Sequence, residues 1–184
     1  THIGGLTIHS WSGLGIKTKL DKYDLDKIAT SEYIVKRVSR TKVLIIDEIS
    51  MLSTNMLDMV DMVCREIKQN DEPFGGIQIV LVGDFFQLPP IVKRDHGENK
   101  QNSLIADTSS SGTFAYEASA WGRARLVVCY LTEQHRQDDA EFLSVLSGIR
   151  ANSVSKKHMD YITSREIEYE DFPENITKLF SHNI

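Results

Sequence analysis

The hydrophobic residues of this chain follow two patterns, apolar runs and helical repeats. Val43–Ile46 and Ile77–Val82 are apolar runs of the kind that forms strands buried on both faces of a sheet. Between them, Asn55–Lys68 carries apolar residues at helical spacing. The order strand, helix, strand favours an α/β fold with a parallel, doubly wound sheet.

Weaker patterns predict the surrounding elements. They indicate helices near His9, over Ser31–Val38 with Ser31 as a cap, over Phe114–Trp121, from a cap at Asp138 or Asp139 through Ile149, and near Lys156–Ile162. They indicate short strands at Leu126–Leu131 and Ile176–Phe180. Residues 93–113 contain little that could be buried, and we expect a long, mobile surface loop there.

Composition narrows the class of protein. The 184 residues are 41% hydrophobic, enough for one compact core and the beginning of a second domain. No segment approaches the ~20 apolar residues of a membrane span, and no signal-peptide pattern opens the chain, so we expect no membrane partner. The net charge of −5 argues against a wholly basic nucleic-acid-binding surface but allows a local groove. Cys64 lies in a helical apolar series, which favours core packing, and the histidines lack metal-ligand spacing.

Two adjacent carboxylates follow the first predicted strand. Asp47 and Glu48 emerge at its carboxyl end, where open α/β sheets place their ligands. One carboxylate can hold the water shell of Mg²⁺, and the other can orient or deprotonate an attacking water. Taken alone, the pair could equally be a solvated acidic turn.

A second polar segment, Gly83–Pro90, follows the other predicted strand. Gly83 allows an unusual backbone turn, and the two prolines at its end stiffen the exit. We therefore expect Gln87 to be held beside the carboxylates, where an amide can bridge a γ-phosphate oxygen and the attacking water. An ordinary turn with Phe85 and Phe86 in the core is the alternative.

These segments resemble conserved motifs of one enzyme family. Asp47–Ser50 and Gly83–Pro90 are similar to motifs II and III of superfamily-one DNA helicases of the RecD and PIF type. Gly4–Trp11 resembles motif Ia, and Leu131–Gln137 resembles motif IV. The four matches stand in the family's order and cover residues 1 to about 150. The tail Thr177–Asn183 resembles the strand that opens the second motor domain.

The resemblance implies a RecA-like motor that uses ATP with Mg²⁺ to travel 5′→3′ on single-stranded DNA and to unwind duplex junctions, as a monomer. It also implies a role in DNA repair, recombination and telomere maintenance, inside the cell: in the cytoplasm of a bacterium, or in the nucleus or mitochondria of a eukaryote. The expected domains are a partial first motor domain over residues 1–150 and, over 151–184, the connection to a second domain.

The resemblance also assigns roles to individual residues. Asp47 is the expected metal ligand, Glu48 the catalytic base, Gln87 the sensor of the γ-phosphate and Arg136 a γ-phosphate contact. Thr7, His9, Ser10 and Trp11 are expected to line the DNA path. Alternatives stay open at several of these positions. Arg136 could form a surface salt bridge, His9 and Ser10 could cap a helix, and Trp11 could belong to the core instead of stacking on a base.

We expect the chain to be part of a longer protein. It begins with Thr1, and it contains no Gly-x-x-x-x-Gly-Lys-Ser/Thr loop and no motif V or VI. Without the loop that cradles phosphates, these 184 residues alone are expected to be inactive as an ATPase. Two rival functions are a catalytically silent binding module and another nucleotide-driven machine, such as a transposition or packaging ATPase. The retained Glu48, Gln87 and Arg136 argue against the first, and the Gly83–Pro90 and Thr7–Trp11 segments argue against the second.

Overall fold

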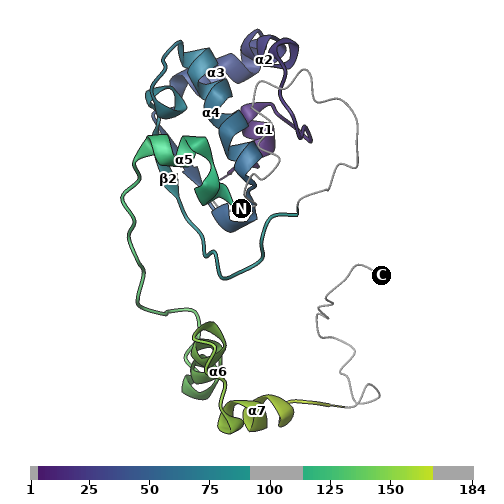
Figure 1. Cartoon of the computed structure of the whole chain (residues 1–184), viewed down its shortest axis with the longest axis vertical. Helices are drawn as coiled ribbons and strands as arrows, with labels where there is room; N and C mark the ends of the chain where they lie inside the picture. The colour runs from purple at the N-terminus through teal and green to yellow at the C-terminus, as the bar shows by residue number, and fades with distance from the viewer. Residues whose placement is uncertain (1–3, 92–113, 168–184) are drawn as a thin grey trace. The chain divides into compact units, whose positions relative to one another are not determined.

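The computed structural model describes residues 4–91 and 114–167, which belong to two compact units, Thr1–Val128 and Cys129–Ile184 (Figure 1). The loop expected at 93–113 and the strand expected at Ile176–Phe180 lie outside the described residues. The domain boundary predicted near residue 150 stays a prediction. None of the helices in the described ranges is long and apolar enough to cross a membrane.

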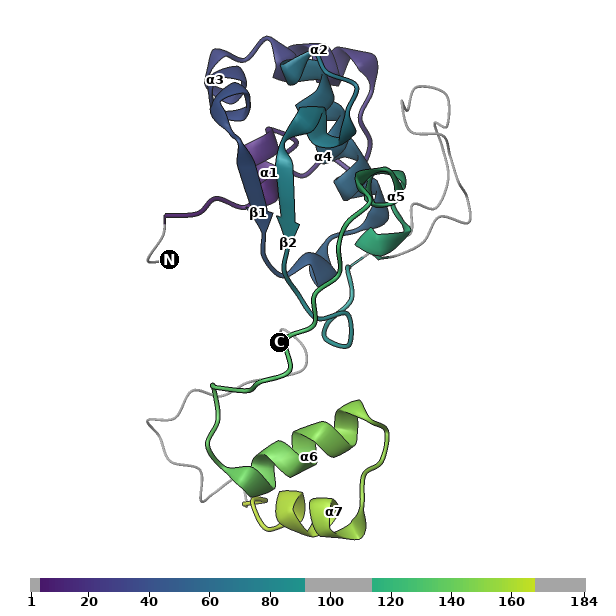
Figure 2. The same cartoon turned by 90° about the vertical axis from the view of Figure 1, so that its left-hand side faces the viewer.

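Two parallel strands form the centre of the first unit. β1 (Val43–Ile46) pairs with β2 (Gln78–Leu81) in a register that sets Val43 opposite Gln78 and Ile46 opposite Leu81 (Figure 2). The crossover between them contains helix α4 (Thr54–Lys68) and the 3-10 turn η2 (Pro73–Gly76). The predicted order of strand, helix and parallel strand is therefore confirmed, and so is the α/β fold class.

Only one face of this strand pair is buried, contrary to the prediction from the apolar runs. Leu44 and Ile46 are 8% and 5% exposed, whereas Val43 and Ile45 on the opposite face are 47% and 64% exposed. Successive side chains on a strand point to opposite faces, so a run that is apolar throughout needs cover on both. Within residues 4–91 and 114–167, such cover lies on one face alone.

The buried face packs against α4, whose apolar stripe supplies much of the core. Leu57, Val60 and Cys64 are each fully buried. Burial raises the pKa of the Cys64 thiol to about 12, with a smaller contribution from the nearby Asp61 carboxylate. Cys64 is therefore a core residue, as its place in the helical series predicted.

Short helices surround this core, and side chains cap two of them, α1 and α2. The helical elements of the first unit besides α4 and η2 are α1 (Ile8–Ser12), α2 (Lys22–Ala29), α3 (Glu32–Arg40), η1 (Ile49–Met51), η3 (Ala115–Glu117) and α5 (Ser119–Ala124). Thr7 caps α1 by accepting a hydrogen bond from Ser10 N at 3.3 Å, and Asp21 caps α2 in the same way at 2.7 Å. Ser31 stands at the cap position of α3, as predicted, although its side chain makes no cap hydrogen bond.

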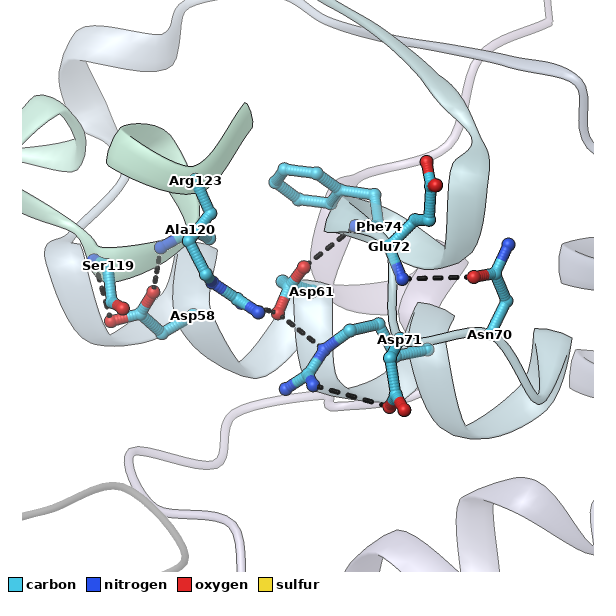
Figure 3. A network of polar contacts seen from close by, with 10 residues as sticks. Asp58, Asp61, Asn70, Asp71, Glu72, Phe74, Ser119, Ala120 and Arg123 are labelled. Carbon is cyan, nitrogen blue, oxygen red and sulfur yellow. Dashed lines mark hydrogen bonds and ion pairs between the residues drawn. The ribbon is translucent and has the colours of Figure 1, made fainter. Parts of the chain in front are cut away.

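Two aspartates on α4 hold the neighbouring segments in place (Figure 3). Asp61 is fully buried, and it accepts hydrogen bonds from Phe74 N at 2.7 Å and Arg65 Nε at 3.0 Å and pairs with Arg123. Asp58 accepts hydrogen bonds from the backbone at the start of α5, with Ala120 N at 2.7 Å. These contacts join α4 to both η2 and α5.

The third strand predicted from Leu126–Leu131 is wrong, because this segment forms no ladder with any described residue. Val127 is 88% exposed and Leu131 is 93% exposed. An apolar run forms a strand only beside a partner whose backbone groups it can pair with, and none of the described segments pairs with it.

The second unit contains a helical hairpin. Its helices are α6 (Ala140–Arg150) and α7 (Lys156–Thr163), which confirms both predicted helices. Asp139 caps α6, with Oδ1 accepting from Glu141 N at 2.9 Å and Phe142 N at 3.0 Å. The pKa of Asp139 is lowered, first by the hydrogen bond from Phe142 N and then by the one from the Tyr161 hydroxyl.

Candidate nucleotide and DNA-binding site

The two candidate carboxylates lie at the carboxyl end of β1, as predicted, and both side chains are exposed. Glu48 adopts a left-handed backbone conformation, with φ 53° and ψ 44°, and the η1 turn begins directly after it. Asp47 Oδ1 accepts a hydrogen bond from Glu48 N at 2.9 Å. The chain therefore leaves the strand after Ile46 and turns at Glu48, and both carboxylates reach solvent at the sheet edge.

Backbone contacts join this edge to the Gly83–Pro90 segment. Ile49 N donates to Val82 O at 3.0 Å, and Val82 N donates to Ile46 O at 2.9 Å. Gly83 packs so closely that an added Cβ would lie 2.9 Å from Ile49 N. A side chain at position 83 would therefore push the two segments apart, which is the physical reason for glycine there.

Asp84 positions Gln87. Its Oδ1 accepts from Phe86 N at 3.1 Å, and its Oδ2 accepts from the Gln87 side-chain Nε2 at 3.2 Å. An ionised carboxylate can only accept, so the amide nitrogen of Gln87 faces Asp84 and the amide oxygen is left for another donor. The sequence pattern alone did not predict this role of Asp84. An aspartate two residues before a turn amide is a known turn signal and could have revealed it.

Aromatic packing anchors the same segment to the core. The Phe85 ring meets Tyr116 edge to face at a centroid distance of 4.9 Å. It also meets Phe114 and Trp121 edge to face, at centroid distances of 6.1 and 6.0 Å. Phe86 is 81% exposed, so only the first of the two phenylalanines is a core residue.

Three of the four candidate DNA-binding residues line one open hollow. Thr7, His9 and Ser10 border a depression of about 630 Å³ together with Gly13, Gly15 and Ile16. All three are exposed, and they lie at the start of α1 and on it. Trp11 is half-buried and packs against the core, which favours the core alternative for this residue.

The remaining candidate, Arg136, belongs to the second unit, where it lies in an exposed segment before α6. The structure thus brings Asp47, Glu48 and the Gln87 segment to one sheet edge and gathers Thr7, His9 and Ser10 elsewhere on the same unit.

The donor set at the sheet edge suits a hard divalent cation. Mg²⁺ is bound in proteins through one or two carboxylates while it keeps several waters. Asp47 Oδ1 accepts from Glu48 N, and Oδ2 accepts no hydrogen bond from any residue in the described ranges. The residues present therefore fit a water-clad Mg²⁺ ion.

Comparison with known proteins identifies the same group of relatives throughout. The sequence pattern of the family described as PIF1-like helicase matches residues 1–160. The chain is 42% identical over 192 aligned positions to the ATP-dependent DNA helicase Pif1 of Psychrobacter sp. (strain PRwf-1), covering 100% of this chain and 27% of that protein. It is 39% identical to the ATP-dependent DNA helicase RRM3 of Saccharomyces cerevisiae, covering 92% of this chain and 22% of the relative. The chain thus spans about a quarter of these relatives.

Solved structures give the same result. The Pif1 helicase of Candida albicans superposes with a TM-score of 0.74 at 33% identity, over 95% of this chain and 36% of that one. A Bacteroides Pif1 in complex with ADP-AlF3 and ssDNA superposes with a TM-score of 0.73 at 34% identity, over 91% of this chain and 38% of that one.

Proposed function

Because this chain belongs to the PIF1-like helicase family, we propose that it supplies part of the first motor domain of an ATP-dependent DNA helicase. The observation that carries the proposal is the joining of Asp47–Glu48 and the Gln87 segment at one sheet edge, through Ile49, Val82 and Gly83. A relative crystallised with ADP-AlF3 and ssDNA supports a motor that uses a nucleotide and grips a single strand.

Glu48 is the general base of the proposed reaction. Its carboxylate accepts a proton from the water that attacks the γ-phosphate, and its exposure at the strand end leaves room for that water. Asp47 would hold Mg²⁺, and the ion would neutralise charge on the phosphates. The two neighbouring carboxylates thus have separate tasks.

Gln87 reports the state of the nucleotide. With its nitrogen held by Asp84, its amide oxygen is free to accept a hydrogen bond from the attacking water. Hydrolysis consumes that water and cleaves the γ-phosphate from the nucleotide, which changes what Gln87 can bind, and the Gly83–Pro90 segment carries the change away from the sheet edge. Arg136 stabilises the charge that develops on the phosphate.

Thr7, His9 and Ser10 bind phosphates of single-stranded DNA in the hollow beside α1. Travel is 5′→3′, by a monomer, and the substrates are single strands and duplex junctions. These finer assignments follow the motif resemblance of the segments concerned.

A strand-displacement assay tests this function in the full-length protein. Matched duplexes carry a single-stranded tail of equal length at either the 5′ or the 3′ end, with ATP or a non-hydrolysable analogue. We expect the strand to be displaced from the 5′-tailed duplex, and only when ATP replaces the non-hydrolysable analogue. Failure on both duplexes would contradict the helicase assignment, and preference for the 3′ tail would overturn the direction.

A further inference from the structure

Arg37 links helix α3 to helix α1, which carries two of the proposed DNA-binding residues. Its Nη2 donates a hydrogen bond to the backbone carbonyl of Ser10 at 2.9 Å. Its guanidinium also lies over the Tyr33 ring, 4.8 Å from the centroid. The side chain is thereby held on its own helix by Tyr33 while its tip reaches across to α1.

Helix α1 depends on such outside support. It has five residues, far below the ~12–15 that an isolated helix needs to be even marginally stable. The Ser10 carbonyl lies in its last turn, where carbonyls lack partners within the helix, and Leu14 N bonds the Ser12 hydroxyl instead. Arg37 therefore satisfies an orphan carbonyl and sets a positive charge at the negative end of the helix.

A second contact from α3 fixes the end of the same helix. Gly13 ends α1 with φ 79°, and an added Cβ there would lie 2.3 Å from Ile34 Cδ1. Ile34 precedes Arg37 by three residues, so both lie on the same side of α3. One apolar and one polar contact from α3 thus determine where α1 stops and how it is oriented.

No carboxylate in the described part of the chain neutralises the charge of Arg37. Among the described residues it forms no ion pair, and its buried Nε has no hydrogen-bond partner. Leaving a donor buried in this way carries a free-energy cost. The side chain nevertheless keeps the position that its contacts with Ser10 and Tyr33 define.

We infer that Arg37 is a positioning residue for DNA binding. It orients α1 so that Thr7, His9 and Ser10 face the hollow, and it does not itself contact phosphate. The inference rests on the proposed role of that hollow in holding DNA.

The test uses the full-length protein and measures single-strand affinity across a range of salt concentrations. For Arg37→Met we expect Kd to rise ~10-fold, the loss typical of one hydrogen bond to a charged group. ATP turnover at saturating DNA should stay within about twofold of the parent protein. The slope of log K against log salt should not change, because Arg37 itself makes no phosphate contact and its loss leaves the number of released counterions the same.

If Arg37 contacted phosphate directly, Arg37→Met would instead make that negative slope shallower by ~0.7, and this result would overturn the inference. Arg40→Met is the matched control, because it removes the same charge from an exposed position one turn along α3. Its Kd should stay within about twofold of the parent value. Equal weakening by both variants would show that charge alone matters.

Arg37→Lys keeps the charge and covers the case in which Arg37→Met does not fold. Lysine lacks the planar fork that meets Ser10 and Tyr33 together, so we expect weaker binding with an unchanged slope. Normal affinity in this variant would contradict the inference. His9→Ala and Ser10→Ala test the proposed function separately. If they bind DNA normally, the hollow is not the DNA site. If they bind weakly while Arg37→Met binds normally, only the inference fails.

Discussion

The backbone of Glu48 determines how two adjacent carboxylates can serve different tasks. On a regular strand, neighbouring side chains point to opposite faces of the sheet. β1 ends at Ile46, and the left-handed conformation at Glu48 turns the chain into η1 directly after the two carboxylates. For a residue other than glycine this conformation costs roughly 1–2 kcal/mol, and such strain is common at functional sites. The turn is therefore part of the proposed site.

Asp84 matters because of the way in which it holds Gln87. Asp84→Asn should keep the bond from Phe86 N but set an amide nitrogen opposite the Gln87 nitrogen. The Gln87 amide must then turn over, and its oxygen no longer faces the water. We expect turnover in the full-length protein to fall ~10-fold or more with little change in nucleotide affinity, since small misplacements near reacting atoms cost this much. Unchanged turnover would show that Asp84 does not orient Gln87.

The residue types at the site could be predicted from the sequence, but their geometry could not. Asp47, Glu48 and Gln87 follow apolar runs, and that pattern sufficed to predict one shared sheet edge. The Asp84–Gln87 bond and the Arg37–Ser10 bond were missed. The first depends on the shape of a turn, and the second joins residues 27 positions apart whose contact no local pattern records.

At the scale of elements, the hydrophobic periodicity predicted correctly the segments that pack against or pair with another described segment. The α4 helix and the β1–β2 pair follow their apolar patterns closely. Leu126–Leu131 has a similar pattern but no pairing with a described strand. Strand formation depends on a neighbour's free backbone groups, which hydropathy alone does not show.

The junction between α4, η2 and α5 depends on the buried carboxylate of Asp61. Asp61→Ala would leave the buried Phe74 amide without its acceptor and two arginines without their partner. We expect the free energy of unfolding to fall by about 3 kcal/mol, as measured by urea denaturation, because breaking a buried pair strands charged and polar groups.

Asp71→Ala is the matched control for this junction. Asp71 is fully exposed and meets Arg65 only at 4.0 Å, so its loss should leave the free energy of unfolding essentially unchanged. Equal effects of the two substitutions would refute the anchoring role of Asp61.

At the scale of the whole molecule, the proposed functions divide between two compact units. The sheet edge and the α1 hollow belong to Thr1–Val128, and Arg136 belongs to Cys129–Ile184. The chain covers 27% and 22% of the relatives' lengths. Its 184 residues contain no Gly-x-x-x-x-Gly-Lys-Ser/Thr loop, so tests of catalysis belong in the full-length protein.

The central claim is that Asp47 and Glu48 form the pair that supports hydrolysis. Its most direct test compares nucleotide affinity, with and without Mg²⁺, and turnover on single-stranded DNA for Glu48→Gln and Asp47→Ala. Glutamine keeps the shape of Glu48 but cannot accept a proton, so turnover should be abolished while ATP still binds with nearly normal affinity. Asp47→Ala should instead weaken the Mg²⁺-dependent part of ATP binding. Near-normal turnover by Glu48→Gln would contradict the account at its centre.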